Sequence, residues 1–188
     1  MNDIEKSVKK HNMVLEIFKE FLIAFLIVII ITLFLKPMII KQSSMEPNFY
    51  ENEYIIVSRQ AYTLFGEEER GDIVIFKSNL VDSNGNNKKL IKRIIGLPGE
   101  TIEITDGYVY INGELLKEPY VKEAGTSGEM EKITLGDDEY FLMGDNREVS
   151  MDSRSSEIGT VKESDIYGRV IIRLFPLNRI STFKRITY

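Results

Sequence analysis

The chain contains no cysteine and a single histidine, His11, close to the N-terminus. The lack of cysteine excludes disulfide scaffolds, thiol nucleophiles, thiolate zinc sites and iron–sulfur clusters. The lack of a further histidine excludes a Ser-His-Asp triad and any multi-histidine metal site in the body of the chain. No motif for a metal or a cofactor is present, so none is predicted. The net charge of -5 argues against a broad nucleic-acid-binding surface.

The 188 residues are 43% hydrophobic and 28% charged, and this balance excludes a disordered or low-complexity chain. The length predicts one domain, or two at most. We see no internal repeat and no long linker.

One long apolar run stands out at residues 21–35, where Thr32 is the only member that is not apolar. As a helix it would be about 22 Å long, somewhat short of the ~30 Å hydrocarbon core of a bilayer. Lys19 and Lys36 flank the run and could reach the membrane surface, and neighbouring apolar residues could lengthen it. The sequence therefore favours a single membrane anchor over residues 21–35.

Two other readings of this run remain open. A buried core helix would be apolar along one stripe, whereas this run is apolar all round. A cleaved signal peptide would begin with a basic region, whereas residues 1–20 mix lysines with acidic residues. Lysines on the two sides of the run, Lys9 and Lys10 against Lys36 and Lys41, leave the orientation undecided.

Residues 36–188 are predicted to form one water-exposed, mainly β domain of antiparallel sheets, arranged as a folded-over or partly open barrel. Two tight hairpin turns are expected at Asp106-Gly107 and Asn112-Gly113, because these pairs supply the positive φ that such turns need. Residues 79–89 are predicted to be a polar hairpin tip and residues 117–131 an exposed loop. The expected strands are residues 53–58, 72–77, 90–95, 101–105, 108–111, 114–116, 139–143 and 168–175.

Ser44 is the first candidate for chemistry, because it lies nine residues after Leu35 and so within about 30 Å of the end of the anchor. A serine is a poor nucleophile without an adjacent base. Where histidine is absent, a neutral lysine is the known substitute. Lowering the pKa of a lysine from about 10.4 to about 7 takes ~4.6 kcal/mol, which burial can supply. The base should therefore be a lysine among apolar residues.

Lys92 fits this description, since Leu90 and Ile94 would share its face of a strand. Lys77 is a rival, although it ends its predicted strand and would reach water more easily. Arg93 has equally apolar neighbours on the opposite face. Spacing alone therefore does not choose among these residues, and by itself it favours an ordinary surface lysine at position 92.

Four segments together resemble the bacterial type I signal peptidases. These are Ser44-Met45-Glu46-Pro47 (S-M-x-P), Arg70-Gly71-Asp72-Ile73-Val74 (R-G-D-I-V), residues 92–100 (K-R-x-x-G-x-P-G-[DE]) and residues 144–154 (G-D-N-R-x-x-S-x-D-S-R). Each motif is modest alone, but four in this order behind one apolar run are specific. The resemblance implies a mainly β fold of two antiparallel-sheet domains.

The resemblance also implies a role for each matching residue. Ser44 would be the nucleophile, Lys92 the general base, and Ser150 the hydroxyl that orients the lysine amine. The backbone N–H of Ser44 would form part of the oxyanion hole. The remaining matches would form a buried polar frame around the site: Asp145, Arg147, Asp152 and Arg154.

One position departs from the family pattern. Some members carry a serine two residues before the nucleophile, where it completes the oxyanion hole, and this chain has Gln42 there. The Gln42 amide could take that part, or the backbone could act alone. Relatives of the endoplasmic-reticulum type carry histidine in place of the lysine, so Lys92 favours the bacterial class.

By resemblance, the substrates would be exported preproteins whose signal peptides lie in the lipid bilayer, cut after small residues at the first and third positions before the scissile bond. Residues 1–20 would be cytoplasmic, residues 21–35 would cross the plasma membrane, and residues 36–188 would be extracytoplasmic. Phe49, Tyr50 and Tyr54 follow Ser44 closely; they could contact lipid headgroups, and a core position is equally compatible for Phe49 and Tyr54.

Two other functions remain as alternatives. A self-cleaving Ser-Lys protease of the repressor type would carry a DNA-binding or partner domain in place of the anchor. A membrane-anchored β domain that only binds partners would have lost Ser44, Lys92 or Ser150, and all three are present.

Overall fold

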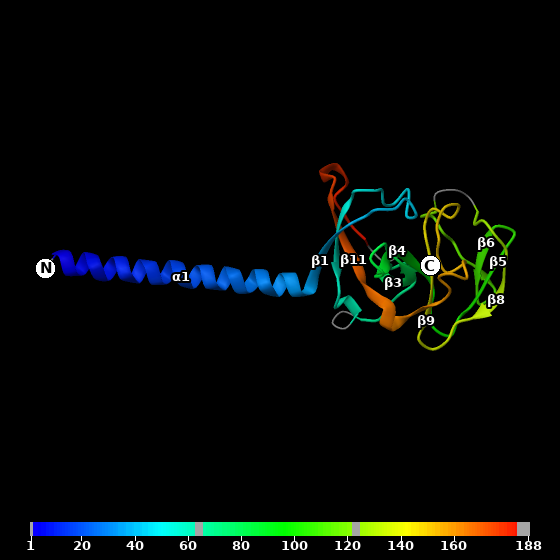
Figure 1. Cartoon of the computed structure of the whole chain (residues 1–188), viewed down its shortest axis with the longest axis horizontal. Helices are drawn as coiled ribbons and strands as arrows, with labels where there is room; N and C mark the ends of the chain where they lie inside the picture. The colour runs from blue at the N-terminus through cyan, green and yellow to red at the C-terminus, as the bar shows by residue number, and fades with distance from the viewer. Residues whose placement is uncertain (1, 63–65, 122–124, 184–188) are drawn as a thin grey trace. The chain divides into compact units, whose positions relative to one another are not determined.

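The computed structural model describes residues 2–62, 66–121 and 125–183 (Figure 1). The chain divides into two units, residues 1–36 and residues 37–188. The first unit is almost entirely one helix, α1 (Asn2–Phe34). Within it, the 22 residues Met13–Phe34 are long and apolar enough to cross a membrane. The predicted apolar helix is therefore present; it starts before residue 21 and ends at Phe34, and Leu35 begins the first strand.

A large sheet dominates the second unit (Figure 1). Across the sheet from β2 to β10, each pair of neighbouring strands is antiparallel. Strand β12 (Ser181–Thr182) also pairs antiparallel with β11. The order across the sheet is β1 (Leu35–Ile39), β2 (Tyr54–Ser58), β11 (Ile166–Phe175), β3 (Ile73–Val81), β4 (Asn87–Gly96), β9 (Glu139–Met143) and β10 (Val161–Lys162).

A smaller antiparallel sheet has the order β7 (Glu114–Leu115), β6 (Tyr108–Ile111), β5 (Thr101–Thr105) and β8 (Met130–Thr134). Two turns join β5 to β6 and β6 to β7. At the first, Asp106 and Gly107 have φ of 51° and 79°; at the second, Asn112 and Gly113 have φ of 53° and 84°. These values confirm the tight turns that the Asp-Gly and Asn-Gly pairs predict. Two short 3-10 turns, η1 (Glu163–Asp165) and η2 (Leu177–Arg179), flank β11.

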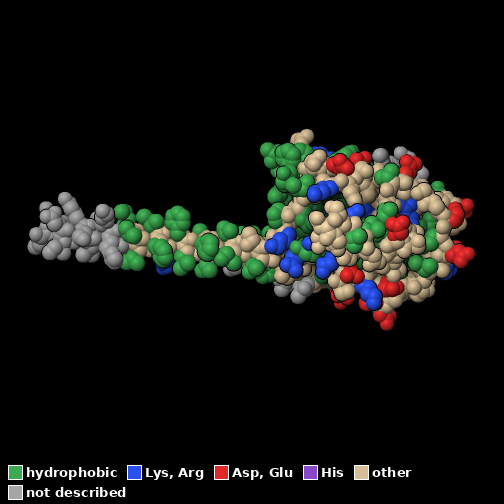
Figure 2. All heavy atoms as spheres, viewed as in Figure 1, with side chains coloured by type: hydrophobic (Ala, Val, Ile, Leu, Met, Phe, Trp, Pro, Cys, Tyr) green, Lys and Arg blue, Asp and Glu red, His purple; other side chains and the backbone are tan. Residues whose placement is uncertain are grey.

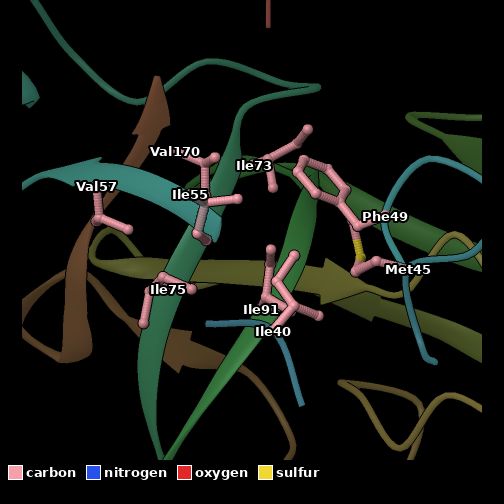
Figure 3. Packing of buried hydrophobic residues seen from close by; sticks show 9 residues of the cluster. All are labelled: Ile40, Met45, Phe49, Ile55, Val57, Ile73, Ile75, Ile91 and Val170. Carbon is pink, nitrogen blue, oxygen red and sulfur yellow. The ribbon is translucent and has the colours of Figure 1, made fainter. Parts of the chain in front are cut away.

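The large sheet is buried on both faces where β3 and β4 cross it. Side chains alternate along β3: Ile73 and Ile75 enter one apolar cluster, while Val74 and Phe76 enter another on the opposite face. Figure 3 shows the first cluster. Its nine members are Ile40, Met45, Phe49, Ile55, Val57, Ile73, Ile75, Ile91 and Val170.

A third apolar cluster joins the two sheets. Phe141 and Met143 of β9 meet Ile102 and Ile104 of β5 and Val109 of β6, all of them buried. The small sheet is thereby packed against the strand that neighbours β4. The mainly β, antiparallel architecture predicted from the sequence is confirmed.

Some local predictions were wrong. Strands β3 and β4 extend to Val81 and back to Asn87, so the polar hairpin tip is shorter than residues 79–89. The segment 117–131, predicted to be an exposed loop, buries Tyr120 and Thr126 and contains the start of β8; residues 122–124 of it lie outside the described residues. Tyr120 is held inward by the third apolar cluster, and Thr126 and Glu118 are held by Arg147, a partner distant in the sequence that periodicity does not detect. Strands β10 and β12 have two residues each, which is too few for a pattern.

Candidate active site

Lys92 lies at the centre of β4 and is buried, with 1% of its surface exposed. Val74 of β3 is its cross-strand neighbour, and Leu90 and Ile94 are also buried. Burial lowers the pKa of the Lys92 amine from 10.5 to about 8, while the carboxylates of Asp152 and Asp145 pull it upward. An amine with a pKa of about 8 is uncharged in roughly a tenth of molecules at pH 7, so it can act as a base.

Ser44 meets this amine although 48 residues separate the two in the chain. Lys92 Nζ donates to Ser44 Oγ at 2.7 Å and to the carbonyl of Ile91 at 3.0 Å. Ser44 is itself 6% exposed. When the amine is uncharged, the hydroxyl can donate to it instead, and this is the geometry that activates a serine.

Two buried side chains anchor the turn that carries Ser44. Met45 and Phe49 are both fully buried, and Figure 3 shows them in the first apolar cluster with Ile73 and Ile91. The N–H of Phe49 donates to the carbonyl of Met45 at 2.9 Å, so residues 45–49 form one closed turn. Tyr50 follows on the exposed side, as does Tyr54 in β2. Of the aromatic residues singled out from the sequence, only Phe49 is in the core.

A second segment, residues 144–146, closes over the serine from the other side. The N–H of Asn146 donates to the carbonyl of Ser44 at 3.0 Å. A Cβ atom at Gly144 would lie 2.4 Å from that carbonyl oxygen and 2.2 Å from Ser150 Oγ. Both distances are too short for any Cβ, so only glycine permits this approach.

The Ser150 hydroxyl is buried beside this glycine and beside the Asp152 carboxylate. Within the described part of the chain it has no well-aligned hydrogen-bond partner. Its predicted action on Lys92 stays a prediction. Burial opposes ionisation of Asp152, but the Arg154 guanidinium, the Gly144 N–H and the Ser150 hydroxyl together hold its pKa below the usual range.

Asp145 is completely buried and forms a two-pronged ion pair with Arg93. Arg93 Nε and NH2 donate to its two oxygens at 2.8 and 2.7 Å, and Asn48 Nδ2 donates to it at 2.8 Å. Sequence reasoning missed Arg93, because it weighed only the apolar neighbours of that residue. Those neighbours were in fact the signal, since an arginine between buried isoleucines needs a carboxylate partner.

The other predicted frame residues also lie around Ser44 and Lys92. Asp152 accepts from Arg154 Nε at 2.8 Å and from the Gly144 N–H at 2.9 Å. Arg147 donates to the Gly144 carbonyl at 3.0 Å and to Glu118 at 2.9 Å. Glu118 was missed because it lies in the segment predicted to be an exposed loop. This contact ties the segment between β7 and β8 of the small sheet to the site.

A cavity of about 350 Å³ opens beside Ser44. Gln42 lines it, and is exposed, together with the apolar side chains of Leu80, Leu90, Val149 and Met151. A second cavity of about 490 Å³ continues along residues 38–42 and 87–91 and shares Gln42 and Leu90 with the first. Within residues 2–62, 66–121 and 125–183, no group of three His, Asp or Glu residues could hold a metal ion. The arrangement is suited to proton transfer from Ser44 to Lys92.

Known proteins resemble this chain over nearly its whole length. The profile of the family described as signal peptidase, peptidase S26, matches residues 14–175. Signal peptidase I of Bacillus licheniformis is 34% identical over 186 residues, covering 94% of this chain and 96% of its own length. Signal peptidase I T of Bacillus subtilis (strain 168) is 37% identical over 188 residues, covering 94% and 93%. A crystal structure of a signal peptidase I from Enterococcus faecalis V583 is 34% identical, with a TM-score of 0.45 over 55% of this chain and 96% of that one.

The close approach at Gly144 predicts the effect of adding one methyl group there. Gly144→Ala should push the Ser44 carbonyl and Ser150 apart and slow acylation of Ser44 by an activated ester by about 100-fold, since a displacement near 1 Å costs this much. Acylation would be followed by mass measurement of the intact chain. Gly136→Ala is the matched control, because the nearest group there is the flexible Glu139 side chain at 3.3 Å. Acylation of Gly144→Ala at the unsubstituted rate would contradict the steric argument.

Proposed function

The chain belongs to the signal peptidase family, peptidase S26, and on that premise we propose that Ser44 is its catalytic nucleophile and Lys92 its general base. The activity of the family, removal of signal peptides by a membrane serine endopeptidase, is the activity of this chain. The observation that carries the assignment of residues is the 2.7 Å contact between Ser44 Oγ and Nζ of Lys92, which is buried in strand β4.

The proposed reaction has two halves. The uncharged Lys92 amine takes the Ser44 proton as Oγ bonds to the scissile carbonyl carbon, and the Ser44 N–H stabilises the oxyanion. The C–N bond then breaks as the Lys92 ammonium gives its proton to the leaving amine of the mature protein. In the second half, Lys92 takes a proton from water, the hydroxide attacks the ester, and the signal peptide leaves as a carboxylic acid while Ser44 regains its proton. Gln42 lines the cavity at Ser44, where its amide could add a second donor.

The substrate would lie in the two cavities, of which the first is lined by Ser44 and the second shares Gln42 and Leu90 with it. Their walls are the chain segments 38–42 and 87–91, which could flank an extended peptide. The cavity next to Ser44 has the apolar side chains of Leu80, Leu90, Val149 and Met151 in its wall. Such a wall suits uncharged side chains, and the small residues at the first and third positions before the cut of exported preproteins are of this kind.

Contact with the lipid bilayer is supported by an apolar rim on the second unit. Figure 2 shows hydrophobic side chains gathered where β11 runs into η2. This rim comprises exposed Tyr54, Leu174, Phe175, Leu177 and Ile180. The rings of Tyr54 and Phe175 touch edge to face at 5.7 Å. Aromatic and aliphatic side chains exposed together on a single surface suit the interface between headgroups and hydrocarbon.

The proposed placement in the cell follows from the substrate. Residues 1–20 would be cytoplasmic, residues 21–35 would cross the plasma membrane once, and residues 36–188 would be extracytoplasmic, where the cleavage site of an exported preprotein emerges. The helical stretch Met13–Phe34 supports the crossing by its length and composition.

The catalytic assignment is tested by cleavage of a secretory preprotein in detergent. Ser44→Ala and Lys92→Ala should each lower kcat by at least about 10⁴-fold while the chain stays folded. Lys77→Ala is the matched control: Lys77 is an exposed lysine on β3, and its loss should leave the rate unchanged. An active Lys92→Ala variant would reject Lys92 as the base. An inactive unsubstituted chain, tried on several preproteins, would favour a domain that only binds.

The lowered pKa of Lys92 predicts the pH profile. Because the uncharged amine is the active form, kcat/KM should rise about tenfold per pH unit below pH 8 and level off above it. The measurement is kcat/KM for a peptide substrate from pH 6 to pH 10. A rise centred near pH 10.5 would mean that the amine is solvated in the working enzyme, and a flat profile would mean that it does not titrate as the base.

The proposed topology predicts protection from protease on one side only. A protease added outside cells stripped of their wall should digest residues 36–188 and spare a tag placed before residue 1. Inside-out vesicles should give the reverse pattern, and detergent should expose both parts. Release of the domain by alkaline carbonate would point instead to a cleaved segment at residues 21–35.

A further inference from the structure

A second charged cluster is separate from Ser44, Lys92 and the polar frame around them. It contacts the turn that carries Ser44. Glu53, which precedes β2, is almost fully buried. Arg173 of β11 pairs with its Oε2 at 3.0 Å, and Arg179 of η2 pairs with its Oε1 at 2.7 Å. None of the motifs found in the sequence includes these three residues.

Both arginines also reach the Ser44 turn. Arg173 NH1 donates to the carbonyl of Asn48 at 2.6 Å. Arg179 NH2 donates to the carbonyls of Pro47 and Asn48, at 3.2 and 3.4 Å. A turn that protrudes from a sheet otherwise leaves such carbonyls to water. Here guanidinium groups bound to a buried carboxylate satisfy them.

Asn48 is thereby held from two sides. Its carbonyl accepts from Arg173, while its side-chain amide donates to Asp145 at 2.8 Å and to the carbonyl of Tyr120 at 2.7 Å. Asp145 belongs to the frame beside Lys92. The residue four positions after Ser44 therefore connects the frame to the Glu53 cluster, and a shift of either would move the turn.

Arg173 is itself fixed in place. Its Nε donates to the carbonyl of Arg179 at 2.7 Å, its NH2 donates to Ser181 Oγ at 3.0 Å, and its guanidinium lies over the ring of Phe49 at 5.5 Å. A planar guanidinium with several fixed donors holds position better than a flexible ammonium. The geometry is thus specific to arginine.

We propose that Arg173, supported by Glu53 and Arg179, is a positioning residue that sets the distance from Ser44 to Lys92 by holding the carbonyl of Asn48. The proposal rests on the proposed function of Ser44 and Lys92. Arg173 touches neither reacting atom and acts through the turn that carries Ser44. Its loss should therefore impair the chemical step more than substrate binding.

The test uses the full chain in detergent with a cleavable preprotein. Arg173→Met keeps the packing of the stem and removes the donors; kcat should fall about 100-fold while KM changes less than about threefold. Arg173→Lys should recover little of this loss. The matched control is Arg169→Met. Arg169 lies on the same strand, but it pairs with Asp72 at 3.1 Å instead of with the Ser44 turn. In this variant kcat should stay within about twofold.

Two further measurements separate a loss of positioning from a loss of folded protein. Arg179→Met removes the partly exposed member and leaves the buried pair intact, so it should fold and lower kcat by about tenfold. In Arg173→Ala, added ethylguanidinium should restore part of kcat, which a loss of folded protein would not allow. Unchanged kcat in Arg173→Met, or equal losses in Arg169→Met, would overturn the proposal. Inactivity of the unsubstituted chain would instead reject the proposed function.

Discussion

The burial of the Lys92 amine is the constraint on which the rest of the site depends. A lysine held at a pKa of about 8 costs roughly 3 kcal/mol of stability at pH 7 relative to a solvated lysine. That cost is acceptable only where apolar packing is dense, and the centre of β4 provides it between β3 and β9. A lysine at the edge of the sheet would stay charged and could not take a proton from Ser44.

The charged residues around the amine are paired in a way that limits their effect on the pKa of Lys92. Asp145 and Asp152 both favour the charged form of Lys92, and unpaired they would return its pKa toward that of a free lysine. Each is bound by an arginine, Asp145 by Arg93 and Asp152 by Arg154. The ion pairs limit the pull of these carboxylates on the proton, while Asp152 still accepts from the Gly144 N–H.

The sequence predicted the strands and turns of the sheets better than it predicted the contacts between residues distant in the chain. Alternation located the central strands, and the Asp-Gly and Asn-Gly pairs located the turns, because both signals are local. The contact between Ser44 and Lys92 spans 48 residues, so only the resemblance of the motifs brought them together. The charged partners of Arg93 and Glu118, Asp145 and Arg147, lie 52 and 29 residues away, and apolar periodicity does not indicate such partners.

The full burial of Met45 and Phe49 makes the turn of Ser44, the proposed nucleophile, part of the folding unit. Catalytic serines are often carried on loops that open independently of the scaffold. In this chain the turn of Ser44 cannot fray without withdrawing two side chains from the largest sheet. Its amides should open only in the global transition, so loss of catalysis on heating reports cooperative melting of the sheet, and an assay of peptide cleavage serves at the same time as an assay of folding.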